Sequence, residues 1–274
     1  MSVVGYRPAS VTYSSEAWAT ERRMIPQSLF SLIPTDQIHV WSADLDFKNG
    51  SVRNYHSFLS TDERSRAEQF CSPIHRNRFI TSRGILRILL GHYLHVDPHL
   101  LSLAYGSHGK PALSELAFHF NISHSEGHAL FAFSSSSPLG VDIERLRPMP
   151  DAIHLATGFF SSTETQELRS IPAEHQAHAF LKCWTRKEAL VKALGKGLSF
   201  PLDQFSMSLD EPARLLQAGH DQPDLLQWQI YHLEPEQNYL GAVATLQKNC
   251  RIVMRQFSEV TVEPELASIM LTTK

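Results

Sequence analysis

The side chains best suited to chemistry are two carboxylates near the middle of the chain. Asp142 and Glu144 lie two residues apart in LGVDIE, a run whose apolar and polar residues alternate as in a β-strand. Side chains at this spacing share one face of a strand. Two carboxylates on one face repel each other, so the face needs a cation or solvent. From the pair alone, a solvated acidic edge strand is the simpler interpretation.

A later segment, residues 180–197, supplies a third carboxylate and a cation. Its sequence FLKCWTRKEALVKALGKG predicts a helix that ends at Gly195 and Gly197. Glu188 and Lys192 are one helical turn apart, where they would form either a surface ion pair or part of a site. Magnesium prefers carboxylate, water and phosphate oxygens. The helix therefore suggests a magnesium and phosphate site if it reaches the acidic strand, which spacing alone does not show.

A third polar cluster precedes the acidic strand. It consists of NISHS (121–125) and, upstream, GKP (109–111). Ser123 and His124 can donate hydrogen bonds to a phosphate, and Lys110 can add positive charge. The same residues would also suit a turn at a strand end. Serine, histidine and aspartate all occur, so a hydrolase triad is an alternative, but no G-x-S-x-G motif surrounds Ser123.

Two capping-box motifs mark the starts of helices that must help to position these residues. Ser60 and Glu63 form an S-x-x-E capping box, and Ser161 and Glu164 form another. After each box the chain predicts a long helix, first over 76–94 and later from residue 180.

Short alternating runs predict the strands. They are expected at 38–45, 116–123, 128–134, 139–144, 204–209, 226–233, 240–246 and 251–257. The small polar turn Ser135–Pro138 predicts that the strands before and after it form a hairpin.

The repeated order of elements indicates an α+β fold made of two similar halves. FLSTDE (58–63) resembles FFSSTE (159–164), and RLRPMP (145–150) between them has two prolines and is typical of a linker. We therefore expect an N-terminal extension, an N-terminal α+β half, a linker, a C-terminal α+β half and a tail, at 1–35, 36–144, 145–152, 153–260 and 261–274.

Composition narrows the class of protein. The net charge of −3 gives no basic field of the kind that binds nucleic acid. No stretch approaches the roughly 20 apolar residues of a membrane span. Three separated cysteines form no disulfide framework, and the N-terminus has no signal-peptide pattern. We therefore expect a cytoplasmic protein that acts on neither nucleic acid nor membranes.

Together these motifs resemble the Sfp-type 4′-phosphopantetheinyl transferases. GVDIE (140–144) and WTRKEALVKALGKGLS (184–199), preceded by GKP and FNISHS, follow the family signature in order. The resemblance covers about residues 36–260 and implies a pseudo-dimer of two α+β halves with the active site in the cleft between them. It implies magnesium ligands at Asp142, Glu144 and Glu188. It places on the coenzyme A phosphates Arg66, Lys110, Ser123, His124 and Lys192. Arg78 is a weaker candidate, and Glu63 stands where some members carry a lysine.

The implied reaction is attack by a serine hydroxyl of an apo acyl or peptidyl carrier protein on coenzyme A. Its products would be the holo-carrier and 3′,5′-ADP, with magnesium as cofactor. Lys192 would stabilise the leaving oxygen, and Glu188, directly or through a water on the metal, is the candidate base. A non-catalytic coenzyme A or nucleotide-binding module and a magnesium-dependent pyrophosphate hydrolase are the alternatives. We expect a monomer, with Arg83 and Arg87 as surface or structural residues.

Overall fold

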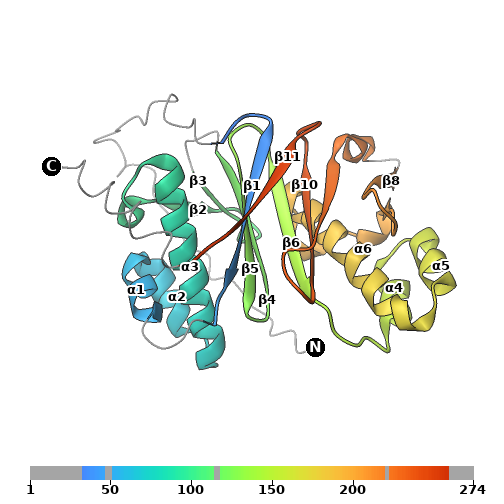
Figure 1. The fold of residues 1–274 in the computed structure, drawn as a ribbon, viewed down its shortest axis with the longest axis horizontal. Helices are drawn as coiled ribbons and strands as arrows, with labels where there is room; N and C mark the ends of the chain where they lie inside the picture. The colour runs from blue at the N-terminus through green and yellow to red at the C-terminus, as the bar shows by residue number, and fades with distance from the viewer. Residues whose placement is uncertain (1–32, 47–50, 114–117, 220–221, 259–274) are drawn as a thin grey trace.

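Two β-sheets stand side by side at the centre of the molecule, and helices cover the outer side of each (Figure 1). The computed structural model describes residues 33–46, 51–113, 118–219 and 222–258. The first sheet has the strand order β11-β1-β5-β4 and the second the order β6-β10-β9. Apolar side chains from both sheets, among them Val40, Leu130 and Val141, pack into a common core between them. The α+β class predicted from the sequence is confirmed.

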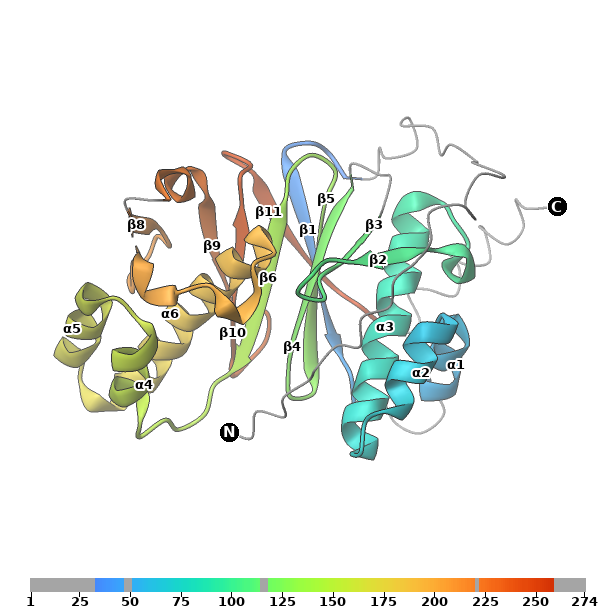
Figure 2. The same ribbon diagram turned by 180° about the vertical axis from the view of Figure 1, so that it is seen from behind.

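The first group of elements contains three of the four strands of the first sheet and the helices that cover it. In chain order it consists of β1 (Gln37–Asp44), α1 (Ser51–Phe58), α2 (Thr61–Glu68), α3 (Pro73–Leu94), β2 (Leu103–Tyr105), β3 (Pro111–Leu113), β4 (His119–Ser125) and β5 (His128–Ser134). Buried residues of α3, such as Leu86 and Leu90, pack on apolar side chains of β1 and β5. The turned view shows the β2–β3 hairpin beside α3 (Figure 2).

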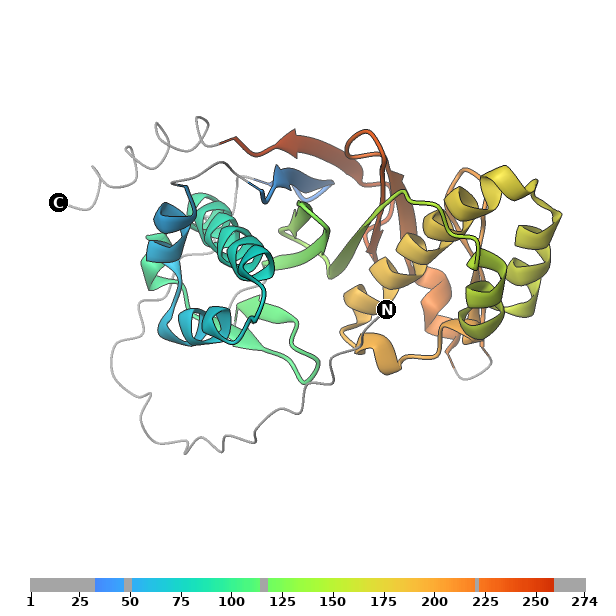
Figure 3. The same cartoon turned by 90° about the horizontal axis from the view of Figure 1, so that it is seen from below.

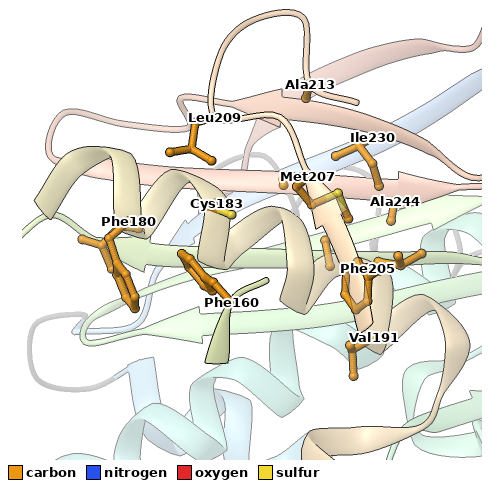
Figure 4. Packing of buried hydrophobic residues seen from close by; sticks show 14 of the residues in the cluster. Phe160, Phe180, Cys183, Val191, Phe205, Met207, Leu209, Ala213, Ile230 and Ala244 are labelled. Atoms are coloured by element: carbon orange, nitrogen blue, oxygen red, sulfur yellow. The ribbon is translucent and has the colours of Figure 1, made fainter. Parts of the chain in front are cut away.

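The second group contains the second sheet with its helical cover and one strand of the first sheet. It consists of β6 (Leu139–Arg145), α4 (Ala152–Phe159), α5 (Ser162–Ser170), α6 (Ala173–Leu194), β7 (Phe205–Met207), β8 (Leu215–Ala218), β9 (Gln229–Leu233), β10 (Tyr239–Thr245) and β11 (Arg251–Gln256). Figure 4 shows the core of this part, which includes Phe205 and Met207. Phe160 stacks there on Phe180, with 4.9 Å between the ring centroids. The 22-residue helix α6 starts at Ala173, earlier than predicted, and ends at Gly195, whose φ is +68°.

The predicted hairpin of residues 128–134 and 139–144 is wrong. β5 pairs with β1 on one edge and with β4 on the other, so neither edge is free for β6. After Ser135–Pro138 the chain crosses to the second sheet, where β6 pairs antiparallel with β10. The true hairpin joins β4 to β5 at Glu126 and Gly127.

On each side of the expected linker at 145–152, one strand pairs with the sheet of the other part of the chain. β6 precedes the linker yet belongs to the second sheet, and β11 follows it yet pairs parallel with β1 of the first sheet. The view from below shows the helices of the two parts on opposite sides of these strands (Figure 3). Most of the expected extension and all of the expected tail lie outside the described residues. None of the described helices is long and apolar enough to cross a membrane.

Candidate active site

The acidic strand and the later helix do meet, because α6 lies directly on the backbone of β6. A Cβ on Gly140 would stand 2.1 Å from the carbonyl oxygen of Ala189 and 2.3 Å from the amide nitrogen of Ala193. Only glycine allows so close an approach. The apolar side chains of β6 enter the core between the sheets, so Asp142 and Glu144 take the alternate face, toward α6.

Asp142 is the centre of the polar contacts at this junction. The residue is 4% exposed. Its Oδ1 accepts hydrogen bonds from Lys192 Nζ at 2.6 Å and from Ser123 Oγ at 2.8 Å, and Lys192 Nζ also donates to Ser123 Oγ at 2.7 Å. The other oxygen, Oδ2, is buried and has no hydrogen-bond partner among the described residues. A buried carboxylate oxygen without a partner is costly, so it needs a cation or water.

Glu188 reaches the same junction from α6. It is 7% exposed, and its Oε1 is a second buried carboxylate oxygen without a hydrogen-bond partner in the described part of the chain. Burial, and after it the charge of Asp142, raises the pKa of Glu188 to about 7. Burial also raises the pKa of Glu144. Its Oε2 accepts a hydrogen bond from Ser125 Oγ at 2.8 Å and lies 3.6 Å from Nη1 of Arg147.

Alternate side chains of β4 bridge the two sheets where their edges meet. Asn121 Oδ1 accepts a hydrogen bond from the backbone of Val141 at 2.8 Å. Ser123 donates to Asp142, and Ser125 donates to Glu144 and accepts from the backbone of Arg145. Sequence reasoning missed Asn121 and Ser125. Their i, i+2 relation to Ser123 on a predicted strand was the available signal.

A cavity of about 240 Å³ opens beside this junction and has basic walls. It is lined from both parts of the chain, by Arg83, Lys110 and His124 from the first and Lys192 from the second, and its lining contains no acidic residue. The ammonium of Lys110 donates to the carbonyl oxygens of Leu139 at 3.0 Å and Lys192 at 2.7 Å. It therefore also links the C-terminal end of α6 to the start of β6. Burial lowers the pKa of Lys110 to about 8.

The remaining basic candidates differ in position. Arg66 is exposed, and its guanidinium lies 5.7 Å from the centre of the Phe79 ring, which lines the cavity. Arg78 does not line the cavity, because it forms a two-pronged ion pair with Asp46 at 2.7 and 2.6 Å.

Glu63 and Arg87 are structural. Glu63 closes the capping box of Ser60 and is 3% exposed, and Arg87 Nε donates to its Oε2 at 2.6 Å. Arg83, which the sequence indicated as a surface or structural residue, is partly buried and lines the cavity.

The site does not form a hydrolase triad. Ser123 donates directly to Asp142, and no imidazole stands between them. Nor do three His, Cys, Asp or Glu side chains within the described ranges stand together as metal ligands. Lys192 takes one oxygen of Asp142 instead. The two partnerless carboxylate oxygens, on Asp142 and Glu188, nevertheless fit a hard cation that prefers oxygen ligands.

Known proteins are similar in sequence to this chain over more than half of its length. Residues 138–244 match the model of the 4′-phosphopantetheinyl transferase superfamily. The 4′-phosphopantetheinyl transferase HetI of Nostoc sp. is 39% identical over 216 residues, 77% of this chain and 88% of the relative. The transferase psf-1 of Bacillus pumilus is 34% identical over 206 residues, 73% and 85% of the two chains. Sfp of Bacillus subtilis is 32% identical over 160 residues, 58% and 70% of the two chains. The junction of β6 and α6 lies within the matched residues, and the chain belongs to the 4′-phosphopantetheinyl transferase family.

Proposed function

We propose that this enzyme transfers the 4′-phosphopantetheine arm of coenzyme A to a serine of an apo acyl or peptidyl carrier protein. The observation that carries the proposal is the basic cavity beside the carboxylates of β6 and α6. A basic cavity suits the phosphates of coenzyme A, and the relatives above are named as transferases of this group.

Magnesium is the proposed cofactor, held by Asp142, Glu144 and Glu188. The support is the pair of buried carboxylate oxygens that have no partner among the described residues. A bound magnesium ion would neutralise charge on the pyrophosphate. Glu144 sits on the same face of β6 as Asp142, and Ser125 fixes one of its oxygens.

The chain's own residues have separate parts in the proposed reaction. The carrier serine oxygen forms a bond to the pantetheine-side phosphorus as the bond from that phosphorus to the 3′,5′-ADP oxygen breaks. Glu188 accepts the serine proton, and the Lys192 ammonium stabilises the leaving oxygen. Ser123 holds Lys192 and Asp142 together. Lys110, His124 and Arg66 are the proposed phosphate contacts.

The two parts of the chain support a pseudo-dimer with this site between its halves. In each half the carboxylate of the capping box is buried and paired with a buried cation on the following 22-residue helix. In the first half the pair is Glu63 and Arg87 at 2.6 Å, and in the second it is Glu164 and Lys187 at 2.9 Å. The cavity walls come from both halves. A chain that supplies both halves needs no second copy, so we propose a monomer. Its three free cysteines support a cytoplasmic location.

A mass measurement on the carrier tests the proposal. The protein is incubated with coenzyme A, magnesium and an apo-carrier, and the carrier should gain the mass of phosphopantetheine. Hydrolysed coenzyme A with an unmodified carrier would instead indicate a hydrolase, and binding without either product a binding module.

Glu188→Gln preserves the shape of the side chain and removes its charge. This variant should lose transfer while its thermal unfolding stays close to that of the wild type. Full activity in Glu188→Gln would exclude Glu188 as the base.

A further inference from the structure

Two serines of β4 meet the two carboxylates of β6 in matching order. Ser123 and Ser125 lie two residues apart on β4. Asp142 and Glu144 have the same spacing on β6. Side chains at i and i+2 share one face of a strand, so each serine can reach one carboxylate. Ser123 Oγ donates to Asp142 Oδ1 at 2.8 Å. Ser125 Oγ donates to Glu144 Oε2, also at 2.8 Å.

The hydroxyl of Ser125 has its direction fixed by the backbone of β6. Ser125 is 8% exposed, so little water competes for its contacts. Its Oγ accepts a hydrogen bond from the backbone amide of Arg145 at 3.1 Å. A serine hydroxyl has one proton, and an ionised carboxylate can only accept. The proton of Ser125 is therefore directed to Glu144 Oε2. Arg147 Nη1 lies 3.6 Å from the same oxygen.

Each of the two strand carboxylates thus has one engaged oxygen and one oxygen left over. Asp142 Oδ1 accepts from Lys192 Nζ as well as from Ser123, whereas Oδ2 has no partner in the described part of the chain. At Glu144 the engaged oxygen is Oε2, and Oε1 forms no hydrogen bond or ion pair within the described ranges. Each carboxylate can therefore offer a cation a single oxygen.

Single oxygens suit one class of divalent cation better than another. Magnesium takes six oxygens in an octahedron and keeps several waters, so one oxygen from each carboxylate is enough. Calcium takes six to eight oxygens and often binds both oxygens of one carboxylate. To bind Glu144 in that way, calcium would have to displace the Ser125 hydroxyl from Oε2.

We propose that Ser125 is a positioning residue that makes Glu144 a one-oxygen ligand and thereby gives the metal site a preference for magnesium over calcium. Ser125 acts through Glu144 and through the backbone of β6, which it holds at Arg145. This inference rests on the magnesium site of the proposed function and adds to it a residue that determines metal specificity.

Metal titrations test the inference without any transfer. The full chain is titrated with Mn²⁺, with and without coenzyme A and without a carrier, and free Mn²⁺ is measured by electron paramagnetic resonance. Bound Mn²⁺ is then displaced with Mg²⁺ or with Ca²⁺, which gives a dissociation constant for each. In the wild type the constant for Ca²⁺ should exceed that for Mg²⁺.

Ser125→Ala should lower the ratio of these two constants roughly 10-fold, because Ca²⁺ no longer competes with a hydrogen bond to a charged group. The constant for Mg²⁺ should change by less than about threefold, because Glu144 Oε1 stays available. Ser125→Thr keeps the hydroxyl and should keep the wild-type ratio. A loss of stability alone would not move this ratio.

Two further variants make the result specific to Glu144. Ser134→Ala removes a hydroxyl that is 0% exposed and accepts from the backbone amides of Ser136 and Ser137. Ser134 lies opposite His119, at the far end of β4 from Ser125, so the metal ratio should stay unchanged. Arg147→Gln alters the other neighbour of Oε2 at a half-exposed position. It should shift the ratio in the same direction as Ser125→Ala but less, even if Ser125→Ala folds poorly.

The outcomes separate this inference from the proposed function. No binding of Mn²⁺ in either state, equal constants for the two ions in the wild type, or an unchanged ratio in Ser125→Ala would overturn the role of Ser125. A wild type that modifies a carrier but does not discriminate between the ions keeps the transfer reaction and loses this inference. A wild type that discriminates but modifies no carrier keeps the inference about Ser125 and loses the transfer reaction.

Discussion

Gly140 lets α6 pack closely on β6 and so aligns the candidate site. Replacing it with alanine should lower both the stability of the protein and its transfer activity. The new Cβ would stand 2.1 Å from the carbonyl oxygen of Ala189 and 2.3 Å from the amide nitrogen of Ala193. Both atoms belong to the backbone of α6, so no flexible side chain can move aside. The helix must shift away from β6, and that shift pulls Lys192 from Asp142 across a contact that is now 2.6 Å.

The expected cost follows from overpacking of a dense interior. Such substitutions typically cost 1–3 kcal/mol and sometimes more. Two backbone contacts this short place Gly140→Ala at the upper end, about 3 kcal/mol. For a chain of this size that corresponds to a fall in Tm of roughly 5–10 °C. Transfer activity should fall as well at temperatures where the variant is folded, because the carboxylates and Lys192 are no longer aligned.

Gly158→Ala is the matched control. A Cβ at Gly158, in α4, would meet no atom within 4 Å. Alanine is the better helix former, so this variant should be as stable as the wild type or more stable by about 0.5–1 kcal/mol. Both variants are compared by thermal unfolding and by the rate of carrier modification. Wild-type stability and activity in Gly140→Ala would refute the view that direct contact of α6 with β6 builds the site.

Two further predictions concern buried charge. Arg87→Met leaves the Glu63 carboxylate buried without its cation and should lower the free energy of unfolding by about 3–5 kcal/mol in urea titrations; a loss below about 1 kcal/mol would contradict a structural role for the pair. Burial lowers the pKa of His39, which is 3% exposed and lies 2.8 Å from the Tyr93 hydroxyl, from 6.5 to about 4. The unfolded chain therefore binds more protons between pH 6.5 and 4, so stability falls as pH drops through this window. His39→Gln should flatten the decline, and an unchanged pH profile would exclude His39 as its source.

The local parts of the fold could be predicted because neighbouring residues determine them. Both capping boxes form as expected, with Ser60 accepting from the Glu63 amide and Ser161 accepting from the Glu164 amide. The end of α6 at Gly195 also follows from one residue type at one position. The partners of the capping-box carboxylates could not be predicted. Arg87 and Lys187 are distant in sequence, and their type alone indicates an exposed face.

Strand pairing shows the same limit at the candidate site. Alternation in LGVDIE predicts a strand with two carboxylates on one face, and the structure has that strand. Alternation does not name the neighbouring strand, so the short turn after β5 suggested a hairpin. The outcome depended on β1, nearly one hundred residues earlier in the chain, which occupies one edge of β5 while β4 occupies the other. The place of Arg83 at the cavity could not be predicted for a related reason: a helix pattern does not show which face meets a cavity.

Because β6 belongs to the second sheet, the carboxylates of the candidate site lie in one half and most of its cations in the other. Asp142 and Glu144 lie on β6, which pairs with β10 and is covered by α6, the helix that carries Glu188. The cations at 83 and 110, with His124, come from the first half. Among the described residues of the site, the β4 side chains and Lys110 join the two sets by hydrogen bonds that cross from one half to the other. A metal site could therefore form within the second half, whereas holding a substrate with two charged groups requires both halves in register. This is the physical reason to expect that mutations at the β4–β6 seam weaken substrate binding more than metal binding.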